Sequence, residues 1–407
     1  MNRGSGWRTV GVALIGLAAS VGRTAAASES TVSPLRSCIA AEAGKLDFSG
    51  VVSVLQSGAL TTFARGLVAG PDSPAITADT RFNLGSASKM FTAVAVAQLL
   101  DAGKIKLDDA IGQYVSGLTP EASRVTVQQL LDHSSGLGDY FAPQNLPALM
   151  KAVTLQDLLP LAAHETPAFQ PGARFAYSDT GFLLLGLMVE HVSRQVYGDY
   201  LQTHVFGPAK MAASGLQPVS APARAIGMTQ TPILLAVPPG PFRQGGPAGG
   251  PAPTDGRPVN HSGPGGPPPL GPLRPAPEAA LQGSSAGGAY STAGDMQRFF
   301  AALLNGELTS AQSLQMLVST QIVVAKADGA QPERDYGFGF GVGRFEGRRW
   351  FGHNGGAPGV NTEATVFPDD GVTVVVLANR DPPAASALFR RLRTELFDPA
   401  AREACER

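Results

Sequence analysis

Apolar residues recur with two different spacings along the chain, and each spacing predicts one type of element. In residues 48–70, two runs rich in β-branched and aromatic residues, FSGVVSVLQSG and LTTFARGLVAG, are joined by a Ser-Gly turn, which predicts a β-hairpin. In residues 88–102 the apolar side chains recur at helical intervals, which predicts a helix with one buried face. Helical patterns then continue to about residue 215, separated by turn sequences such as SSGLGD and QPGARF.

The last part of the chain returns to strand patterns. STAGDMQRFFAALLNG and SAQSLQMLVS predict two helices, and ALFRRLRTELF predicts a final one. Between them lie three β-rich runs, YGFGFGVGRFEG, RRWFGHNGG and TEATVFPDDGVTVVVLANR. Strands at both ends with helices between them predict an α/β (α+β) fold in which helices flank an antiparallel sheet. We expect the sheet domain to be discontinuous, residues 28–102 and 284–407, with an all-helical subdomain inserted at residues 103–237.

The composition adds a segment that fits neither spacing. The chain contains 49 glycines and 33 prolines, and these residues dominate the stretch from PPGPFRQGGPAGGP to PPPLGPLRPAP. Such a composition supplies few helix or sheet hydrogen bonds and buries little apolar surface. We therefore predict an extended or disordered surface loop at residues 238–283.

The first 27 residues have the pattern of a secretory signal peptide. Arg3 and Arg8 precede an apolar run, VGVALIGLAASVG, and small residues follow in TAAAS. A membrane anchor is the alternative, but the run is shorter than the ~20 residues that a span needs. We expect cleavage after Ala27, a periplasmic or secreted protein, and no membrane span after cleavage.

Charge and histidine spacing limit the partners. The chain has 31 basic and 32 acidic residues, so it offers no basic surface to nucleic acid or to an anionic membrane. The six histidines lack the spacing of metal ligands, and we expect neither a metal nor a cofactor. The sequence carries no signal for the oligomeric state.

The two cysteines, Cys38 and Cys405, lie at opposite ends of the chain. In an oxidising compartment they form either a disulfide or two unpaired thiols. The predicted discontinuous sheet would place the terminal segments side by side, which favours the disulfide.

Candidate chemistry begins at residues 82–91, FNLGSASKMF, where a strand end leads into the predicted helix. Residues three apart lie on one face of a helix, so the Lys89 amine can reach the Ser86 hydroxyl. A serine at a helix N-terminus also lies at the positive end of the helix dipole, which stabilises a developing oxyanion. The alternative is a serine that caps the helix, Ser86 or Ser88, and a solvated lysine. The spacing alone does not decide between them.

Two further motifs favour the catalytic interpretation. In FAYSDTGFLLLG, Tyr177 follows a turn and could relay a proton to a leaving group. In RRWFGHNGGAPGV, a β-rich run ends in His353 and glycines, which let backbone N–H groups approach a ligand closely. Taken singly, these motifs also fit an ordinary partly buried tyrosine and a strand-end histidine.

In this order, the three motifs resemble those of the serine β-lactamase-like family. That family comprises class C β-lactamases, D-Ala-D-Ala carboxypeptidases, D-aminopeptidases and related carboxylesterases. Two framing segments, VTVQQLLDHSSGL and GGAYSTAGDMQRF, add to the resemblance, which runs from about Phe48 to Phe397. It implies the fold shared by β-lactamases and penicillin-binding-protein transpeptidases.

The resemblance implies a role for each motif residue. Ser86 would be the acylated nucleophile, Lys89 its proton acceptor, and Tyr177 the acid/base that serves the leaving group and later the water. The backbone N–H groups of Ser86 and Gly356 would form the oxyanion hole. The substrate-binding residues would be Asp179, His353, Asn354 and Gly355.

Two residues depart from the family's pattern. Asp179 stands where the second motif commonly has Asn, and an ionised carboxylate can only accept hydrogen bonds. Near Lys89 it would favour the ammonium form, so either Asp179 points elsewhere or the site relies more on Tyr177. His353 stands where relatives often carry Lys, and a largely neutral imidazole attracts a substrate carboxylate less than an ammonium does.

These observations predict an exported serine hydrolase that acts on a small ester, peptide or amide through an acyl-serine intermediate. Its activity would be that of an esterase, a D-aminopeptidase or a DD-peptidase. One alternative is a weak β-lactamase or penicillin-binding protein. Another is a binding protein with the same fold, whose catalytic site Asp179 has silenced.

Overall fold

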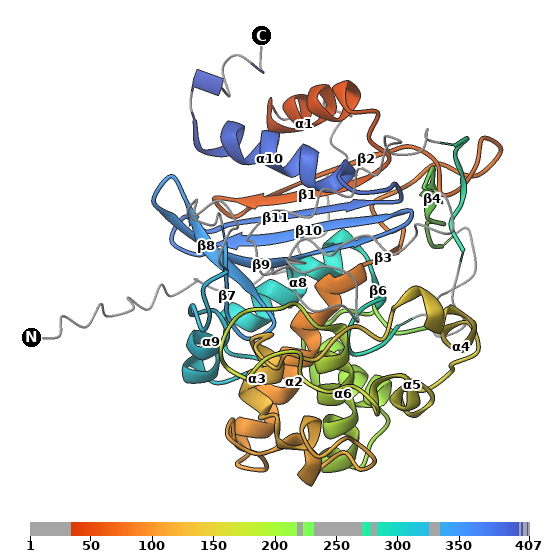
Figure 1. The fold of residues 1–407 in the computed structure, drawn as a ribbon. Coiled ribbons are helices and arrows are strands. Elements are labelled where there is room, and N and C mark those ends of the chain that lie inside the picture. The colour runs from red at the N-terminus through yellow and green to blue at the C-terminus, as the bar shows by residue number, and fades with distance from the viewer. Residues whose placement is uncertain are drawn as a thin grey trace, which may run out of the picture.

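The computed structural model describes residues 34–217, 223–231, 271–277, 283–324, 334–398, 400–401 and 405. A seven-stranded antiparallel sheet crosses the molecule in the order β2-β1-β11-β10-β9-β8-β7 (Figure 1). Its strands are β1 (Gly50–Gln56), β2 (Ala59–Arg65), β7 (Asp335–Tyr336), β8 (Gly341–Phe345), β9 (Arg348–Ala357), β10 (Val360–Phe367) and β11 (Val372–Ala378). Short two-stranded pairs are β3 (Phe82–Asn83) with β6 (Tyr290–Ser291) and β4 (Met228–Thr229) with β5 (Arg274–Pro275).

Strand β1 joins the N-terminal hairpin to the C-terminal strands. It pairs antiparallel with β11, from Gly50 opposite Ala378 to Leu55 opposite Thr373. Both strands are almost entirely buried, which agrees with their continuous apolar runs. The predicted sheet, discontinuous in sequence and flanked by helices, is confirmed.

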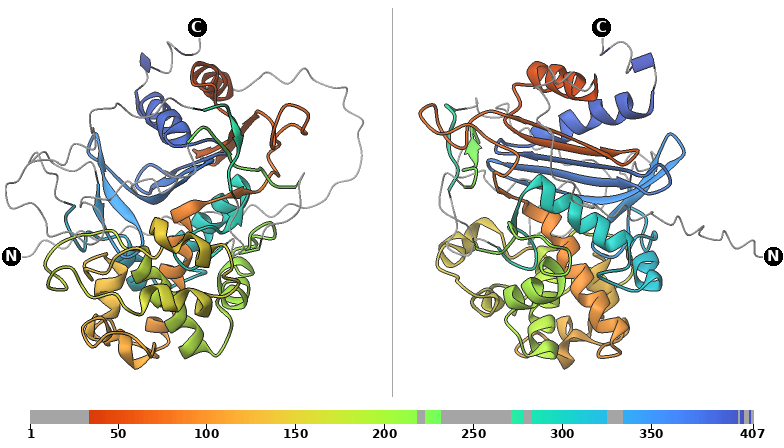
Figure 2. Two further views of the ribbon diagram at one scale, coloured as in Figure 1. Left: turned by 45° about the vertical axis from the view of Figure 1, so that its right-hand side comes forward. Right: turned by 180° about the vertical axis from the view of Figure 1, so that it is seen from behind.

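Helices cover both faces of the sheet (Figure 2). On the outer face lie α1 (Pro34–Lys45) and α10 (Ala384–Phe397), whose apolar residues pack with those of β1, β10 and β11. On the inner face lie α2 (Lys89–Asp101) and α8 (Ala293–Leu304) within the larger hydrophobic core. Beyond them the helical part contains α3 (Val127–Leu131), α4 (Leu146–Leu149), α5 (Leu155–Ala162), α6 (Asp179–Ser193) and α7 (Tyr197–Leu201), and α9 (Ala311–Leu317) lies beside α2.

Shorter helical turns connect these elements: η1 (Gly85–Ser88), η2 (Ile111–Gln113), η3 (Ala122–Arg124), η4 (Pro143–Asn145) and η5 (Gln202–Phe206). Helix α1, which precedes the first strand, was not expected from the sequence, and neither was the ladder between β4 and β5. Strand β4 lies in the part predicted to be all-helical, and β5 lies in the segment predicted to be a loop. The predicted signal peptide, residues 1–27, and most of residues 238–283 lie outside the described residues. No helix in the described part of the chain is long and apolar enough to cross a membrane.

The two ends of the described chain meet on the outer face. Cys38 of α1 and Cys405 form a disulfide with their Cα atoms 5.3 Å apart. Close by, Arg391 of α10 donates to Glu42 of α1 at 2.8 Å. Helix α1 is therefore joined to α10 by an ion pair and to the segment after α10 by a covalent bond.

Candidate active site

Ser86 lies on η1, the helical turn between β3 and α2. The turn begins at Gly85, whose φ of 51° favours glycine, and the Asn83 side chain accepts from the Gly85 N–H at 2.8 Å. The Ser88 hydroxyl donates to the Gly85 carbonyl and accepts from the Ala289 N–H, so it makes no cap for α2. Neither η1 nor α2 has a side-chain cap at its N-terminus, so the capping role of the alternative interpretation is not seen for either serine. Ser86 is partly exposed.

Lys89 is fully buried, which rules out the solvated lysine of the alternative interpretation. Its Nζ donates to Ser86 Oγ at 3.3 Å, to Asp179 Oδ1 at 2.5 Å and to the Ala286 carbonyl. The Nζ atom also lies 4.8 Å from the centre of the Tyr177 ring. All the partners of this amine are therefore protein groups around the serine hydroxyl.

Asp179, the first residue of α6, points at Lys89 rather than elsewhere. Burial lowers the pKa of Lys89, and the charge and hydrogen bond of Asp179 oppose that shift. The direction that prevails is downward, because the amine is removed from water on all sides. The Asp179 carboxylate thus restrains the loss of the Lys89 proton without cancelling the effect of burial.

Tyr177 stands directly before the N-cap of α6, Ser178. Its hydroxyl interacts with the Ser86 side chain, and the ring packs 4.2 Å from that of His133, centre to centre. Burial, followed by the charge of Asp179, raises the pKa of Tyr177 well above its ordinary value. The phenol is therefore neutral and holds a proton within reach of the serine oxygen.

Glycines on β9 allow this strand to approach the serine turn closely. A Cβ atom on Gly355 would lie 2.0 Å from the Leu84 carbonyl oxygen and 3.0 Å from the Ser86 nitrogen. A Cβ atom on Gly85 would lie 3.0 Å from the Gly356 nitrogen. The two backbone nitrogens expected to form an oxyanion hole, those of Ser86 and Gly356, therefore lie along one contact between η1 and β9.

His353 belongs to a buried chain of hydrogen bonds that sequence reasoning missed. The Ser178 N–H donates to His133 Nδ1 at 3.1 Å, and His133 Nε2 lies 3.1 Å from Tyr336 Oη. Tyr336 Oη lies 2.9 Å from His353 Nε2, and His353 Nδ1 lies 2.5 Å from the Asn354 carbonyl oxygen.

At one end of this chain the Ser178 N–H can only donate, and at the other the Asn354 carbonyl oxygen can only accept. These two groups fix the direction of every hydrogen bond between them. His133 Nδ1 must accept, so its Nε2–H donates to Tyr336, which donates to His353, which donates to the backbone carbonyl. Burial, followed by the charge of Lys89, lowers the pKa of both imidazoles, that of His353 to about 3. His353 is thus neutral, with both ring nitrogens engaged inside the protein. The ring of His133 also packs against that of Tyr177.

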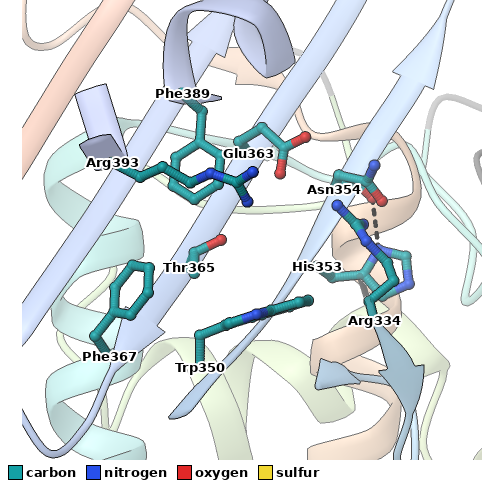
Figure 3. Close-up of a pocket in the computed structure, with 9 residues that line it drawn as sticks. All are labelled: Arg334, Trp350, His353, Asn354, Glu363, Thr365, Phe367, Phe389 and Arg393. Atoms are coloured by element: carbon teal, nitrogen blue, oxygen red, sulfur yellow. Dashed lines mark hydrogen bonds between the residues drawn. The ribbon is translucent and has the colours of Figure 1, made fainter. Parts of the chain in front are cut away.

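Asn354, which the sequence analysis predicts to bind substrate, has its side chain on the opposite side of the sheet from that of His353. Neighbouring residues of a strand face opposite sides, so His353 faces the inner side with its partner Ala364, whereas Asn354 shares the outer side with Glu363. There both line a small cavity of about 20 Å³ beneath α10, with Arg334 and Arg393 beside them (Figure 3). The Asn354 side chain therefore lies on the far side of the sheet from the serine.

The chain matches a known protein family over most of its length. The family model described as Beta-lactamase matches residues 35–397. A penicillin-binding protein of Bacillus subtilis is 35% identical over 136 residues, which cover 32% of this chain and 29% of the relative. The matches to this and the next two curated relatives span less than half of each relative's length.

Solved structures match over most of the chain. A penicillin-binding protein from Bacillus halodurans has a TM-score of 0.72 and 26% identity, over 88% of this chain and 99% of that one. A D-stereospecific amidohydrolase from a Streptomyces species has a TM-score of 0.68 and 23% identity, over 89% of this chain and 98% of that one. At this identity, the likeness to the amidohydrolase shows a shared fold.

Proposed function

The chain belongs to the beta-lactamase family of serine hydrolases, and on that premise we propose that it cleaves esters or small peptides and amides through an acyl-enzyme on Ser86. One observation carries this proposal: the Nζ atom of the fully buried Lys89 lies 3.3 Å from Ser86 Oγ while burial lowers the pKa of Lys89. A lysine acts as a base only when it can lose its proton, and burial is what favours that loss.

In the proposed acylation step, Lys89 takes the Ser86 proton as Oγ attacks the substrate carbonyl carbon. The negative charge that develops on the carbonyl oxygen is stabilised by the backbone N–H groups of Ser86 and Gly356. When the tetrahedral intermediate collapses, Tyr177 gives its proton to the leaving group and regains one from Lys89. The products of this step are the acyl-serine and a neutral alcohol or amine.

Deacylation runs the same proton path in reverse. Tyr177 gives its own proton to the neutral Lys89 amine and takes one from the attacking water. Collapse of the second tetrahedral intermediate breaks the bond to Ser86 Oγ, which takes the proton back. The enzyme is then regenerated with a free carboxylic acid as the second product.

The residues around the serine favour esters and small D-amino-acid amides over β-lactams. Asp179 is bound to Lys89 and can only accept hydrogen bonds, so it offers no donor to a substrate amide carbonyl. His353 is neutral and has both nitrogens engaged, so it supplies no cation for a substrate carboxylate. A curated relative from Escherichia coli is named a putative D-alanyl-D-alanine carboxypeptidase, which makes a D-peptide substrate the second candidate. We also propose that the protein is exported, because of its N-terminal pattern.

Ester turnover by Ser86→Ala tests the catalytic part of this proposal. We expect the variant to lose essentially all hydrolysis of p-nitrophenyl esters, and Ser88→Ala, which alters the neighbouring hydroxyl, to retain far more. Unchanged turnover by Ser86→Ala would refute the assignment. A parallel screen of D-amino-acid amides, a D-Ala-D-Ala peptide and nitrocefin would rank the substrate classes.

A further inference from the structure

We propose that Asn361 is a positioning residue of the oxyanion hole, which it connects to the N-terminus of α10. This inference rests on the proposed function. Asn361 lies in β10 directly opposite Gly356, and it is 3% exposed. Its side chain shares the outer side of β10 with Glu363, two residues on, and this side is covered by α10.

The side-chain amide of Asn361 has a partner at each end. Its Nδ2 donates to the Gly355 carbonyl oxygen at 3.0 Å. Its Oδ1 accepts from the N–H groups of Ala385 and Ser386, at 2.7 Å and 3.1 Å. These are N–H groups of the first turn of α10, which receives no side-chain cap from its own N-cap residue. Because only the oxygen can accept and only the nitrogen can donate, these partners fix the orientation of the amide.

The hydrogen bond that the Gly355 carbonyl accepts also affects the N–H of Gly356, because this C=O and this N–H belong to the same peptide group. In a planar trans peptide the C=O and the N–H point in opposite directions. The carbonyl points towards Asn361, so the N–H points towards η1, where a Cβ atom on Gly85 would come within 3.0 Å of the Gly356 nitrogen. Asn361 therefore holds the plane of the peptide that presents this N–H to the Ser86 turn.

The same contacts strengthen the N–H of Gly356 as a donor. A carbonyl that accepts a hydrogen bond polarises its peptide, and hydrogen bonds in series reinforce one another in a poorly solvated interior. The series starts at α10, a helix of 14 residues whose N-terminus carries a partial positive charge. It runs through the Asn361 amide and the 355–356 peptide to the position of the oxyanion. Both ends of the amide are held, so the donor is oriented before the substrate arrives.

Asn361→Asp tests this inference because it removes the hydrogen-bond donor of the side chain and keeps the acceptor. The aspartate keeps oxygen acceptors for the α10 N–H groups, so the helix stays capped, but it cannot donate to the Gly355 carbonyl. The matched control is Asn379→Asp at the end of the neighbouring strand. Asn379 is also a buried amide, which accepts from Ser49 at 2.7 Å and donates to two backbone carbonyls.

Two readouts report on the oxyanion hole: kcat/KM for a p-nitrophenyl ester, and the affinity for an arylboronic acid, whose tetrahedral adduct with Ser86 places an oxygen in the hole. For Asn361→Asp we expect both to fall together by about ten- to a hundredfold, somewhat less than when a donor is deleted outright. Asn379→Asp should leave both close to wild type. Thermal melting of each variant confirms that folded protein is compared, and Asn361→Ser replaces Asn361→Asp if the latter does not fold.

The outcomes separate the inference from the proposed function. If the wild type hydrolyses the ester but Asn361→Asp matches Asn379→Asp in both readouts, Asn361 has no part in the oxyanion hole. A loss of kcat/KM without a matching loss of boronate affinity also overturns the inference. If the wild type itself neither hydrolyses the ester nor binds the boronate, the proposed function is what has failed.

Discussion

Asp179 stands where the second motif of the family commonly has Asn, and it contacts Lys89, the proposed base, so this difference affects the pKa of the base. Burial and the Asp179 carboxylate act on the pKa of Lys89 in opposite directions, and burial prevails. The carboxylate therefore sets how far the Lys89 pKa falls. The fully buried amine and the hydroxyl of Ser86 remain in contact at 3.3 Å.

Asp179→Asn should shift the pH dependence of hydrolysis. The substitution removes a negative charge that raises the pKa of Lys89, so this pKa falls further and the neutral amine persists to lower pH. The acidic limb of kcat/KM against pH should accordingly move to lower pH. As a control, Asp295→Asn removes another buried carboxylate, one that pairs with Arg298, and should leave the limb in place. If the acidic limb of Asp179→Asn lies at the same pH as in the wild type, or at higher pH, this account of Lys89 is contradicted.

Local sequence patterns identify single residues of the site but not the contacts between residues that are distant in sequence. The order of the motifs identified Ser86, Lys89 and Tyr177, because each lies at the junction of a strand or turn with a helix. The pattern did not reveal that His133 and Tyr336, 203 positions apart, share a hydrogen bond beside Tyr177. Their meeting depends on how the helical part packs against the sheet. The HSSGL and YGFGF segments that carry them were the only local signal.

At the scale of elements, the contact between β9 and η1 decides the geometry of the site. Gly355 lies where a Cβ atom would overlap the Leu84 carbonyl, so the strand can come this close only with glycine. The alternation of strand residues then directs His353 inward and Asn354 outward, so these two adjacent residues of the motif face opposite sides of the sheet.

Gly355→Ala should therefore reduce activity strongly. The added methyl group forces β9 away from η1, and displacement of a catalytic group by about 1 Å can cost roughly a hundredfold in rate. The control is Gly341→Ala in β8, where a Cβ atom would make ordinary contacts, the nearest at 3.5 Å. Steady-state kinetics of the two variants provide the comparison. Equal activity in both would mean that the close approach of β9 is unimportant for catalysis.

Elements with strong periodic patterns were predicted well from the sequence. The strands that build the sheet and helices α2, α6, α8 and α10 lie where their patterns placed them. Helix α1 was overlooked although Leu35, Ile39 and Ala43 recur at four-residue spacing, because the segment is short and adjoins the predicted signal peptide. Strand β5 was overlooked because its ladder with β4 is two residues long and contains a proline.

At the scale of the whole molecule, the fold brings the two ends of the described chain together on the side of the sheet opposite Ser86. The disulfide between Cys38 and Cys405 closes a loop with a sequence separation of 367 residues. It joins α1 to the segment that follows α10, and both helices pack on the outer core. The proposed catalytic residues lie across the sheet, on its inner side.

The double variant Cys38→Ser/Cys405→Ser should be less stable but still active. Loss of a native disulfide commonly lowers the free energy of unfolding by about 2–4 kcal/mol, since the unfolded chain regains freedom. Urea denaturation under non-reducing conditions measures this difference, and ester turnover below the transition measures activity. Equal stability of the two proteins would show that the disulfide does not hold the termini, and lost turnover in folded protein would show that it supports the site.

The most direct test of the central claim is to identify the residue that an active-site-directed fluorophosphonate modifies. Intact mass spectrometry of the labelled protein, followed by peptide mapping, should show one adduct, located on Ser86. Labelling should be absent in Ser86→Ala and slower by orders of magnitude in Lys89→Met, which fills the same space without a base. A folded wild-type protein that takes no label, or an adduct on any other residue, would contradict the claim that Ser86 is a nucleophile activated by Lys89.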